Sequence, residues 1–332
     1  MCARPVPSPP FISLSDSLAR FLRRVLSEQE EARDALAPTP VHDLRVALRR
    51  CRSLAEGFSK FDSHPDWGQM RKTARRLQRG LAELRDAQVL AGWVRRLGLT
   101  QGSAGAAFTE SIRRDDRRAR RVARRALADF PRKRWKRWRR RLPQRAVGFA
   151  ARPAWFAPLA LQHAKQAADF ERRWRRSGSR IAAHRLRIAV KRFRYTVESF
   201  LPEPYAAWQR HLKRLQDSLG EVHDLDVLRG RIFRLAKQGT LSRNLLEIWL
   251  PRIERARKER VERYWKVVAP QAAVAKHGRR RPALWDRWRQ ELQLLATLTP
   301  PRRATASTTE ASADALPPER TSGHRGRPLR PS

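Results

Sequence analysis

A seventeen-residue segment occurs twice in this chain, from His42 to Phe58 and again from His184 to Phe200. The copies, HDLRVALRRCRSLAEGF and HRLRIAVKRFRYTVESF, are identical at eight positions and conservatively substituted at three more. Agreement of this extent is not expected by chance, so we interpret the chain as an internal duplication. Any fold proposed for the chain must therefore place two copies of one element.

Each copy predicts an amphipathic helix with one apolar face and one cationic face. At about 100° per residue, the basic residues of a copy fall in one narrow sector, opposite the apolar ones. The sector holds His42, Arg45, Arg49 and Arg52 in the first copy and His184, Arg187, Lys191 and Arg194 in the second, with Arg50 and Arg192 on the flanks. The sequence therefore contains two matching cationic stripes, each headed by a histidine.

These stripes have two interpretations. Cations three or four residues apart repel by a few tenths of a kcal/mol, and only Arg52 and Arg194 have an acid at helical spacing, Glu56 and Glu198. A single stripe of this kind is best explained as a solvated helix face. Solvation does not require the same cations and the same histidine at matching steps, so the repetition favours an anionic ligand.

The composition supports a strongly anionic partner. The chain has 74 Lys and Arg, most of them Arg, against 32 Asp and Glu, for a net charge of +42. Arginine offers a planar fork suited to phosphate oxygens. Cys2 and Cys51 give no disulfide framework or zinc spacing. Because no apolar run is long enough to span a membrane and no secretion signal is evident, we expect a soluble protein of the reducing cytoplasm, without a membrane partner.

The periodicity predicts an all-α chain. We expect disorder over residues 1–10 and 299–332, and a join between two halves, about 11–142 and 155–298, near Pro143, Pro153 and Pro158. Gly220 is expected to break the helical pattern into helices over 205–219 and 224–237, and Pro251 to kink a helix over 241–268.

Two further features have competing interpretations. Asp86 and Asp224 share a second repeated signature, in which capping a helix or pairing with Arg is favoured over catalysis. Trp135 and Trp138 alternate with cations, which permits base stacking, although anchoring a helix beneath arginine stems is the simpler interpretation.

The paired pattern H-x-x-R-x-x-x-[RK]-R-x-R, each followed by a helix ending near E-x-x-D-x-x-V-L, resembles the CHAD (conserved histidine α-helical domain) family over roughly 11–298. The resemblance implies two helical bundles related by a pseudo-twofold axis around a basic central groove. It also implies non-enzymatic binding of inorganic polyphosphate, without a cofactor or metal. The E-x-E-x-K signature of the triphosphate-hydrolysing domain often fused to this family is absent, so a stand-alone form is expected.

The resemblance extends the binding set beyond the two stripes and their flanking Arg50 and Arg192. It adds a following helix in each half, with Lys72, Arg75, Arg76 and Arg79 in the first and Arg210, Lys213 and Arg214 in the second. Asp217 stands where the second half should match Arg79, so weaker polyphosphate binding is expected there. Such a protein could associate with polyphosphate granules.

Two rival functions fit less well. Non-specific nucleic-acid binding is the main alternative, because the charge permits it, although we recognise no nucleic-acid-binding motif. An enzyme acting on phosphorylated substrates is disfavoured, since we find no Walker loop, no H-E-x-x-H and no acidic cluster suited to Mg²⁺.

Overall fold

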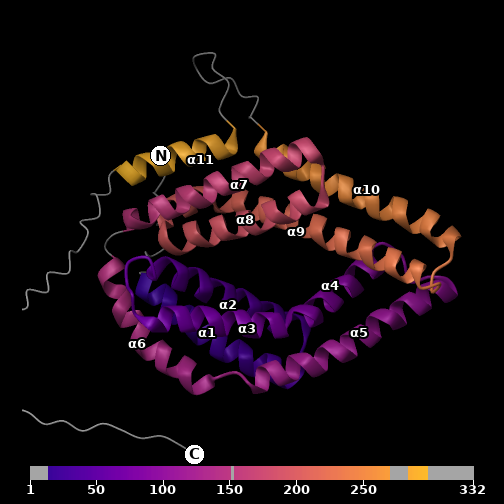
Figure 1. Ribbon diagram of the computed structural model, residues 1–332, viewed down its shortest axis with the longest axis horizontal. Coiled ribbons are helices and arrows are strands. Elements are labelled where there is room, and N and C mark those ends of the chain that lie inside the picture. Colours follow the sequence, from indigo (N-terminus) through magenta and orange to yellow (C-terminus); the bar gives the residue numbers. More distant parts are fainter. Residues whose placement is uncertain (1–13, 151–152, 270–282, 298–332) are drawn as a thin grey trace, which may run out of the picture. The chain divides into compact units, whose positions relative to one another are not determined.

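The computed structural model describes residues 14–150, 153–269 and 283–297, and every regular element in these ranges is helical (Figure 1). The prediction of an all-α fold is confirmed. The ends expected to be disordered, residues 1–10 and 299–332, lie outside the described residues. The helices are α1 (Leu14–Ala35), α2 (Pro38–Phe58), α3 (Pro65–Gly80), α4 (Ala82–Arg96), α5 (Gly102–Ala128), α6 (Arg132–Ala150), a 3₁₀ turn (Pro153–Phe156), α7 (Ala157–Ser177), α8 (Arg180–Phe200), α9 (Pro202–Lys237), α10 (Arg243–Val268) and α11 (Leu284–Thr297).

The helices form two layers that follow the order of the chain (Figure 1). In the first layer α1 packs against α2 and α6, α2 against α3, and α4 against α5. In the second layer α8 packs between α7 and α9, α10 lies along α9, and α11 lies on α7. The repeated helices α2 and α8 contact each other across the layers, as do α4 and α9. These two contacts bring segments about 140 residues apart into one site.

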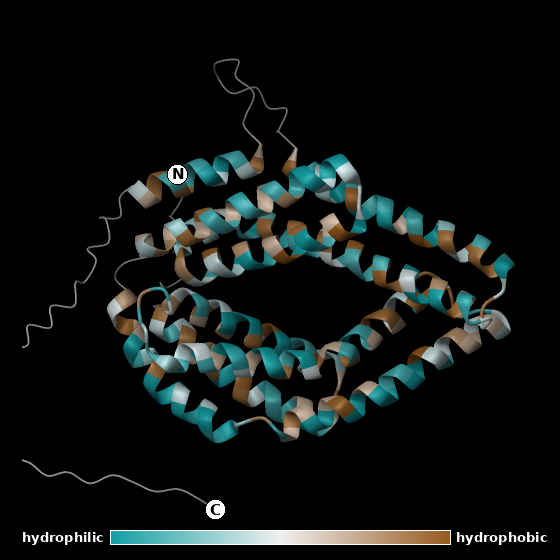
Figure 2. Cartoon of the chain, in the orientation of Figure 1, coloured by the Kyte–Doolittle hydropathy of each residue, from teal (hydrophilic) through white to brown (hydrophobic). Residues whose placement is uncertain are grey.

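Two separate apolar cores hold the layers together. The larger core contains the apolar faces of α2 and α8, as the helical periodicity predicts, together with side chains from α1, α6, α7 and α11. The smaller core is built by α4, α5, α9 and α10, around Trp93, Phe108 and Trp249. Figure 2 shows short hydrophobic and hydrophilic stretches that alternate along the helices, as expected for amphipathic helices. The long helices α9 and α10 link both cores, because each also contributes buried side chains to the larger one, such as Leu215 of α9 and Tyr264 of α10.

The contact between α2 and α8 is unusually close at their C-terminal ends. Gly57 leaves room for the ring of Phe200, because a Cβ atom at residue 57 would come within 2.2 Å of Phe200 Cζ. Phe58 meets the same ring edge-on at 5.5 Å between ring centroids, and Phe156 stacks on it at 4.0 Å. All three rings are fully buried. This aromatic cluster fixes the distance between the two repeated helices.

The predicted helix break at Gly220 is wrong. Residues 202–237 form one continuous helix, α9, and the break falls instead in the first half, at Leu81 between α3 and α4. A glycine costs only about 1 kcal/mol inside a helix, and flanking buried residues such as Leu219 and Val222 supply more than that by packing. The N-cap interpretation of the repeated aspartates is also wrong. Asp224 lies inside α9, and Asp86 lies in the second turn of α4.

The region predicted as the join between halves is shorter than expected. Pro143 lies inside α6, which continues to residue 150. The connection between the layers therefore begins only after the end of α6. Pro251 likewise lies inside α10. Trp135 and Trp138 on α6 are both fully buried in the larger core. Their burial supports the anchoring interpretation and leaves neither ring available to stack on a base.

Candidate functional site

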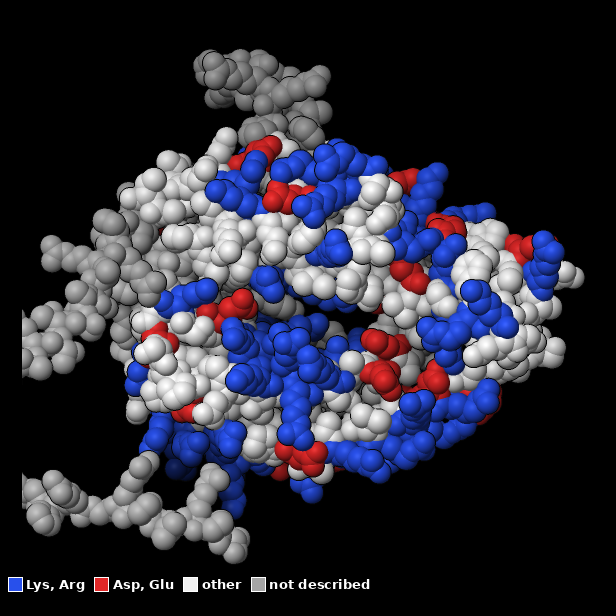
Figure 3. Space-filling view, viewed as in Figure 1, with Lys and Arg blue, Asp and Glu red and all other residues white. Residues whose placement is uncertain are grey.

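The cationic stripes of α2 and α8 lie on either side of a basic groove. Helices α4 and α9, which contact these two helices and each other, border the groove further along. Burial lowers the pKa of Arg187, and Arg49 from the opposite helix contributes to this shift. Burial and the neighbouring Arg49 lower the pKa of Arg45 to about 10, with a smaller contribution from Arg187. Figure 3 shows Lys and Arg side chains gathered along the edge of a central hollow. The groove residues are His42, Arg45, Arg49 and Arg85 from the first half and His184, Arg187, Lys191 and His223 from the second.

Lys191 shows most clearly how crowded the positive charge is. Its pKa lies well below the ordinary range of lysine because its ammonium group is buried, with Arg187 and Arg49 as the next largest causes. Arg45 adds to the same effect from across the groove. A lowered pKa means that the environment disfavours the charged form, so the groove holds its cations at a free-energy cost.

Several buried donors in the stripes have no acceptor. Among the described residues, the Nε atoms of Arg49, Arg52, Arg187 and Arg194 are buried and make no hydrogen bond. A buried donor without a partner costs about 1–3 kcal/mol. Both stripes contribute to this set, and two of its members, Arg49 and Arg187, lie in the groove. An anion with several acceptor oxygens is the kind of ligand that removes such a cost.

Gln78 on α3 positions part of the first stripe. Arg45 donates from Nη1 to the backbone carbonyl of Gln78 at 2.7 Å, and Arg52 donates from Nη1 to its side-chain oxygen at 2.6 Å. The Gln78 amide in turn donates to the Arg45 carbonyl at 3.1 Å. These bonds fix two guanidinium groups between α2 and α3 before any ligand arrives.

Two carboxylates lie in the groove and partly offset its charge. Asp224 is acted on by Arg187 and Lys191 and accepts a hydrogen bond from Trp93, yet burial still raises its pKa above the ordinary value. Asp86 interacts electrostatically with Arg45 and Arg187. Interaction with arginine was one of the two interpretations offered for these aspartates. Two carboxylates against five arginine and lysine side chains and the histidines leave the groove strongly positive.

The histidines do not lie where free helix N–H groups are. His42 and His184 are each the fifth residue of their helix, and the α2 start carries Pro38 and Pro40, which have no N–H to offer. His42 is exposed, whereas His184 Nδ1 lies 3.2 Å from Nδ1 of His223. A contribution of backbone N–H groups at the histidines is therefore not available.

Some predicted site residues are engaged elsewhere. Arg50 does not face the groove stripe, because its Nη1 donates to Glu198 Oε1 at 2.6 Å and its guanidinium lies over the Phe21 ring. Arg76 points toward the α5–α6 connection, where it pairs with Asp129 at 3.6 Å. Sequence periodicity places both residues beside cations but does not reveal these partners.

The remaining predicted cations of the first layer and of α8 lie around the stripes. Arg75 and Arg192 both approach Arg52 closely enough to lower its pKa, after the larger effect of burial. Arg194 lies 4.0 Å from Glu198, the acid four residues later. Lys72 and Arg79 are exposed on α3.

The predicted cations of α9 do not join the groove residues. Arg210, Lys213 and Arg214 are exposed, Lys213 pairs with Asp217 at 2.6 Å, and Arg214 lines a separate cavity beside α10. Asp217, which stands where a cation was expected, therefore neutralises Lys213.

Two groove residues were not predicted from the sequence. Arg85 and His223 occupy matching places directly before the repeated Asp86 and Asp224. Arg85 contributes to lowering the pKa of His42, and His223 contacts His184. Both residues lie within the second repeated signature. They differ in type, so a comparison of the two copies for identical residues does not identify them.

Other classes of site find no support in the described part of the chain. Residues 14–150, 153–269 and 283–297 contain no group of three His, Cys, Asp or Glu side chains arranged to hold a metal ion. Among the described helices, none has both the length and the apolar character required of a transmembrane span.

Comparisons with known proteins agree with the fold and with the family resemblance. The crystal structure of the CHAD domain from the plant Ricinus communis is similar to this structure with a TM-score of 0.52 and 22% sequence identity, covering 88% of this chain and 96% of that chain. No match is found among curated proteins. The sequence model of the CHAD domain matches residues 16–232, and the chain therefore belongs to the CHAD domain family.

Proposed function

We propose that this protein binds inorganic polyphosphate in the basic groove and does not act on it as an enzyme. The family is associated with polyphosphate binding. The observation that carries the proposal is the mutual approach of the α2 and α8 stripes, in which each row lowers the pKa of the other's cations. A polyanion placed between the rows relieves this repulsion and accepts from the unpartnered donors.

The shape of the site favours a polymer over a single phosphate. The stripe from His42 to Arg52 spans about 15 Å of helix, at about 1.5 Å per residue, and a second row lies opposite. Each charge-assisted hydrogen bond contributes about 1.5–3 kcal/mol, so several in sequence outweigh the cost of ordering a flexible chain. Trp135 and Trp138, the aromatic residues interleaved with cations, are buried, which supports a ligand without bases over a nucleic acid.

The first test removes charge from the groove without removing a structural bond. Arg49 and Arg187 are the most suitable positions, because each has a buried Nε without an acceptor, whereas Arg45 also holds Gln78. The variant Arg49→Gln with Arg187→Gln should weaken polyphosphate binding by about 100-fold or more, from two lost bonds of about 1.5–3 kcal/mol each. Isothermal titration calorimetry with long-chain polyphosphate measures the change.

A matched control removes the same charge elsewhere. Arg118 and Arg121 are exposed on α5 and outside the groove, so Arg118→Gln with Arg121→Gln should change the affinity by less than about threefold. Equal losses in the two variants would show that only net charge matters and would contradict the groove as the site.

Incubation with polyphosphate and Mg²⁺ should release no phosphate, and sustained turnover would overturn the non-enzymatic proposal. Groove binding would also carry the protein to polyphosphate granules in the cytoplasm.

A further inference from the structure

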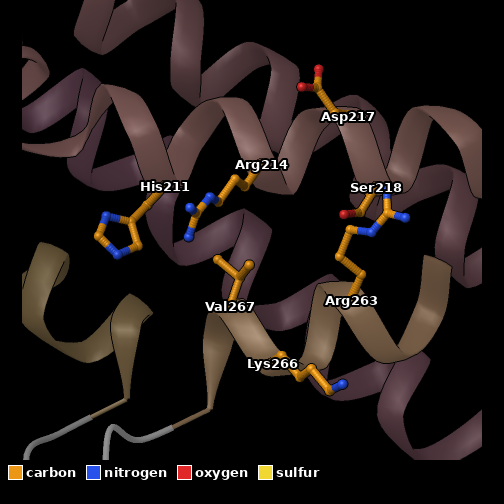
Figure 4. Close-up of a pocket in the computed structure, with 7 residues that line it drawn as sticks. All are labelled: His211, Arg214, Asp217, Ser218, Arg263, Lys266 and Val267. Atoms are coloured by element: carbon orange, nitrogen blue, oxygen red, sulfur yellow. The ribbon is translucent and has the colours of Figure 1, made fainter. Parts of the chain in front are cut away.

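A second cavity of about 460 Å³ lies on the other side of α9, between this helix and the C-terminal part of α10 (Figure 4). Its lining comes from two turns of α9 and the last turns of α10. In Figure 4, His211 and Arg214 project from α9 toward Val267 of α10. The lining residues are His211, Arg214, Asp217, Ser218, Arg263, Lys266 and Val267.

Positive charge dominates this cavity. Three of its lining residues are cations, Arg214, Arg263 and Lys266, and its one acid, Asp217, is held by Lys213 at 2.6 Å. Arg263 also approaches Glu221 at 3.6 Å, but Glu221 is bound more closely by Arg260, at 2.9 Å. At least two cations, Arg214 and Lys266, have no acid within ion-pair distance among the described residues. An anion in the cavity would meet an uncompensated positive field.

Ser218 supplies an independent sign of a ligand. Its side chain is fully buried and lines the cavity, and its hydroxyl has no hydrogen-bond partner among the described residues. Buried hydroxyls are almost always bonded, so one left open in the wall of a cationic cavity indicates an acceptor that binds there. A hydroxyl can donate to an oxyanion but adds no charge of its own, which suits recognition of a phosphoryl oxygen.

The cavity is distinct from the basic groove. At about 100° per residue, Arg214 and Ser218 lie on roughly the opposite flank of α9 from His223, which contacts His184 in the groove. The apolar face of α9, including Leu215 and Leu219, lies between the two flanks and is buried in the larger core. A single compact anion therefore cannot occupy both places.

We propose that this cavity is a second anion site, which binds a phosphoryl group through Arg214, Lys266 and the Ser218 hydroxyl. The phosphoryl group belongs either to a free small phosphate such as pyrophosphate or to the end of a polyphosphate chain. His211 lines the same cavity, and burial and the nearby Arg287 lower its pKa. Binding of an anion beside it should raise that pKa again.

The test uses the full-length protein carrying Arg49→Gln and Arg187→Gln, in which the groove is weakened. Titration with inorganic pyrophosphate, without a metal ion, should show one saturable binding event in the calorimeter. Adding Arg214→Gln with Lys266→Gln should weaken it at least 10-fold, and adding Ser218→Ala should weaken it several-fold without lowering the melting temperature. The His211 ring resonances should shift on titration in the NMR spectrum. A matched control, Arg255→Gln with Lys258→Gln, removes two exposed cations of α10 outside the cavity and should leave binding unchanged.

The outcome separates this site from the groove. If pyrophosphate does not bind the groove variant, or binds equally when Arg214 and Lys266 are replaced, the second site is disproved. Long-chain polyphosphate binding to the wild type reports on the groove independently, so either proposal can fail alone. Displacement of pyrophosphate from the groove variant by long chains would show that a chain end reaches the cavity, and lack of displacement would assign the site to free phosphates.

Discussion

Gly57 of α2 lies directly against the ring of Phe200 of α8, so close that a methyl group on residue 57 would reach within 2.2 Å of Phe200 Cζ. Phe200 cannot move aside, because Phe156 stacks on its ring at 4.0 Å and Phe58 meets it edge-on. The separation of α2 and α8 is thus set at the aromatic end of both helices. The same separation sets the distance between the two cationic rows further along.

Gly57→Ala should therefore destabilise the protein by about 2–3 kcal/mol, the upper range for overpacking a closed core. The measurement is the free energy of unfolding in urea. Shortening the opposing side chain should restore part of the loss, so Gly57→Ala with Phe200→Leu should be more stable than the sum of the two single changes predicts. Additive effects would show that the glycine and the ring do not meet as described.

The periodicity of the sequence predicted the class of fold and the two cationic stripes, because a helix converts residue spacing directly into a face. Cys51 and Phe193 lie in the core, and Arg49 and Lys191 lie outside it, as the 3.6-residue pattern requires. That the rows meet follows from packing between segments far apart in the chain, which spacing alone does not determine. The interpretation of the repeat as an internal duplication remains a prediction from the sequence.

The ion pair between Arg50 and Glu198 should contribute to stability and not to binding. Both side chains are more than four-fifths buried and their atoms lie 2.6 Å apart. Arg50→Met keeps most of the packing over Phe21 and should cost about 2 kcal/mol, between the values for exposed and for buried pairs, because Tyr205 still donates to Glu198. Urea unfolding measures the cost, and calorimetry with polyphosphate should show an affinity within about threefold of the wild type.

Arg192, the matching residue of the second copy, provides the control. Its side chain is exposed, and among the described residues its guanidinium donates a hydrogen bond to Gln166 alone, at 3.4 Å, so Arg192→Met should change the free energy of unfolding by less than about 0.5 kcal/mol. If Arg50→Met weakened binding strongly without affecting stability, Arg50 would belong to the site after all.

Arg50, Arg85 and Gly220 show where the sequence was insufficient. The partner of Arg50 is 148 residues away, and no local pattern reveals it. Arg85 is identified as a groove residue only once α4 is seen beside α2. Gly220 has the residue type of a helix break, but burial of the surrounding α9 residues outweighs its modest propensity cost. In each case a tertiary contact decided the outcome.

Polyphosphate binding should strengthen as the pH falls. In the free protein, burial lowers the pKa of His184 and lowers that of His223 to about 3, with Arg187 and Lys191 adding to both effects. A bound polyanion raises both values, so binding takes up protons and the affinity rises as the pH falls through the pKa values of the bound state. Protonation of the facing Asp224, whose pKa is already raised, acts in the same direction. Calorimetry from pH 8 to pH 5.5 in buffers of different ionisation enthalpy measures both the affinity and the proton uptake.

The histidine pair can be separated from other titrating groups by substitution. His184→Gln with His223→Gln should flatten the pH dependence while leaving binding at pH 8 within a few-fold of the wild type. Binding that weakens as the pH falls, or proton release on binding, would contradict the arrangement of charge described for the groove.

His163 should make the stability of the protein depend on pH. Its ring is buried, with Nδ1 2.9 Å from the Thr196 hydroxyl oxygen, and burial lowers its pKa from 6.5 to about 4. The unfolded chain therefore takes up the proton first, so this stability is fully present above about pH 6.5 and is lost as the pH falls to about 4. The shift corresponds to about 3 kcal/mol. Urea unfolding across this range should show a shallower decline in His163→Gln than in the wild type.

Competition between polyphosphate and nucleic acid tests the central claim most directly. The protein is first bound to a fluorescent DNA duplex or single strand at fixed salt, and long-chain polyphosphate or unlabelled nucleic acid is then added at equal phosphate concentration. The two rows of the groove predict that polyphosphate displaces the labelled strand at a concentration at least 10-fold lower than the unlabelled nucleic acid, and that Arg49→Gln with Arg187→Gln removes this advantage. Displacement by nucleic acid at the same or a lower concentration would contradict the account.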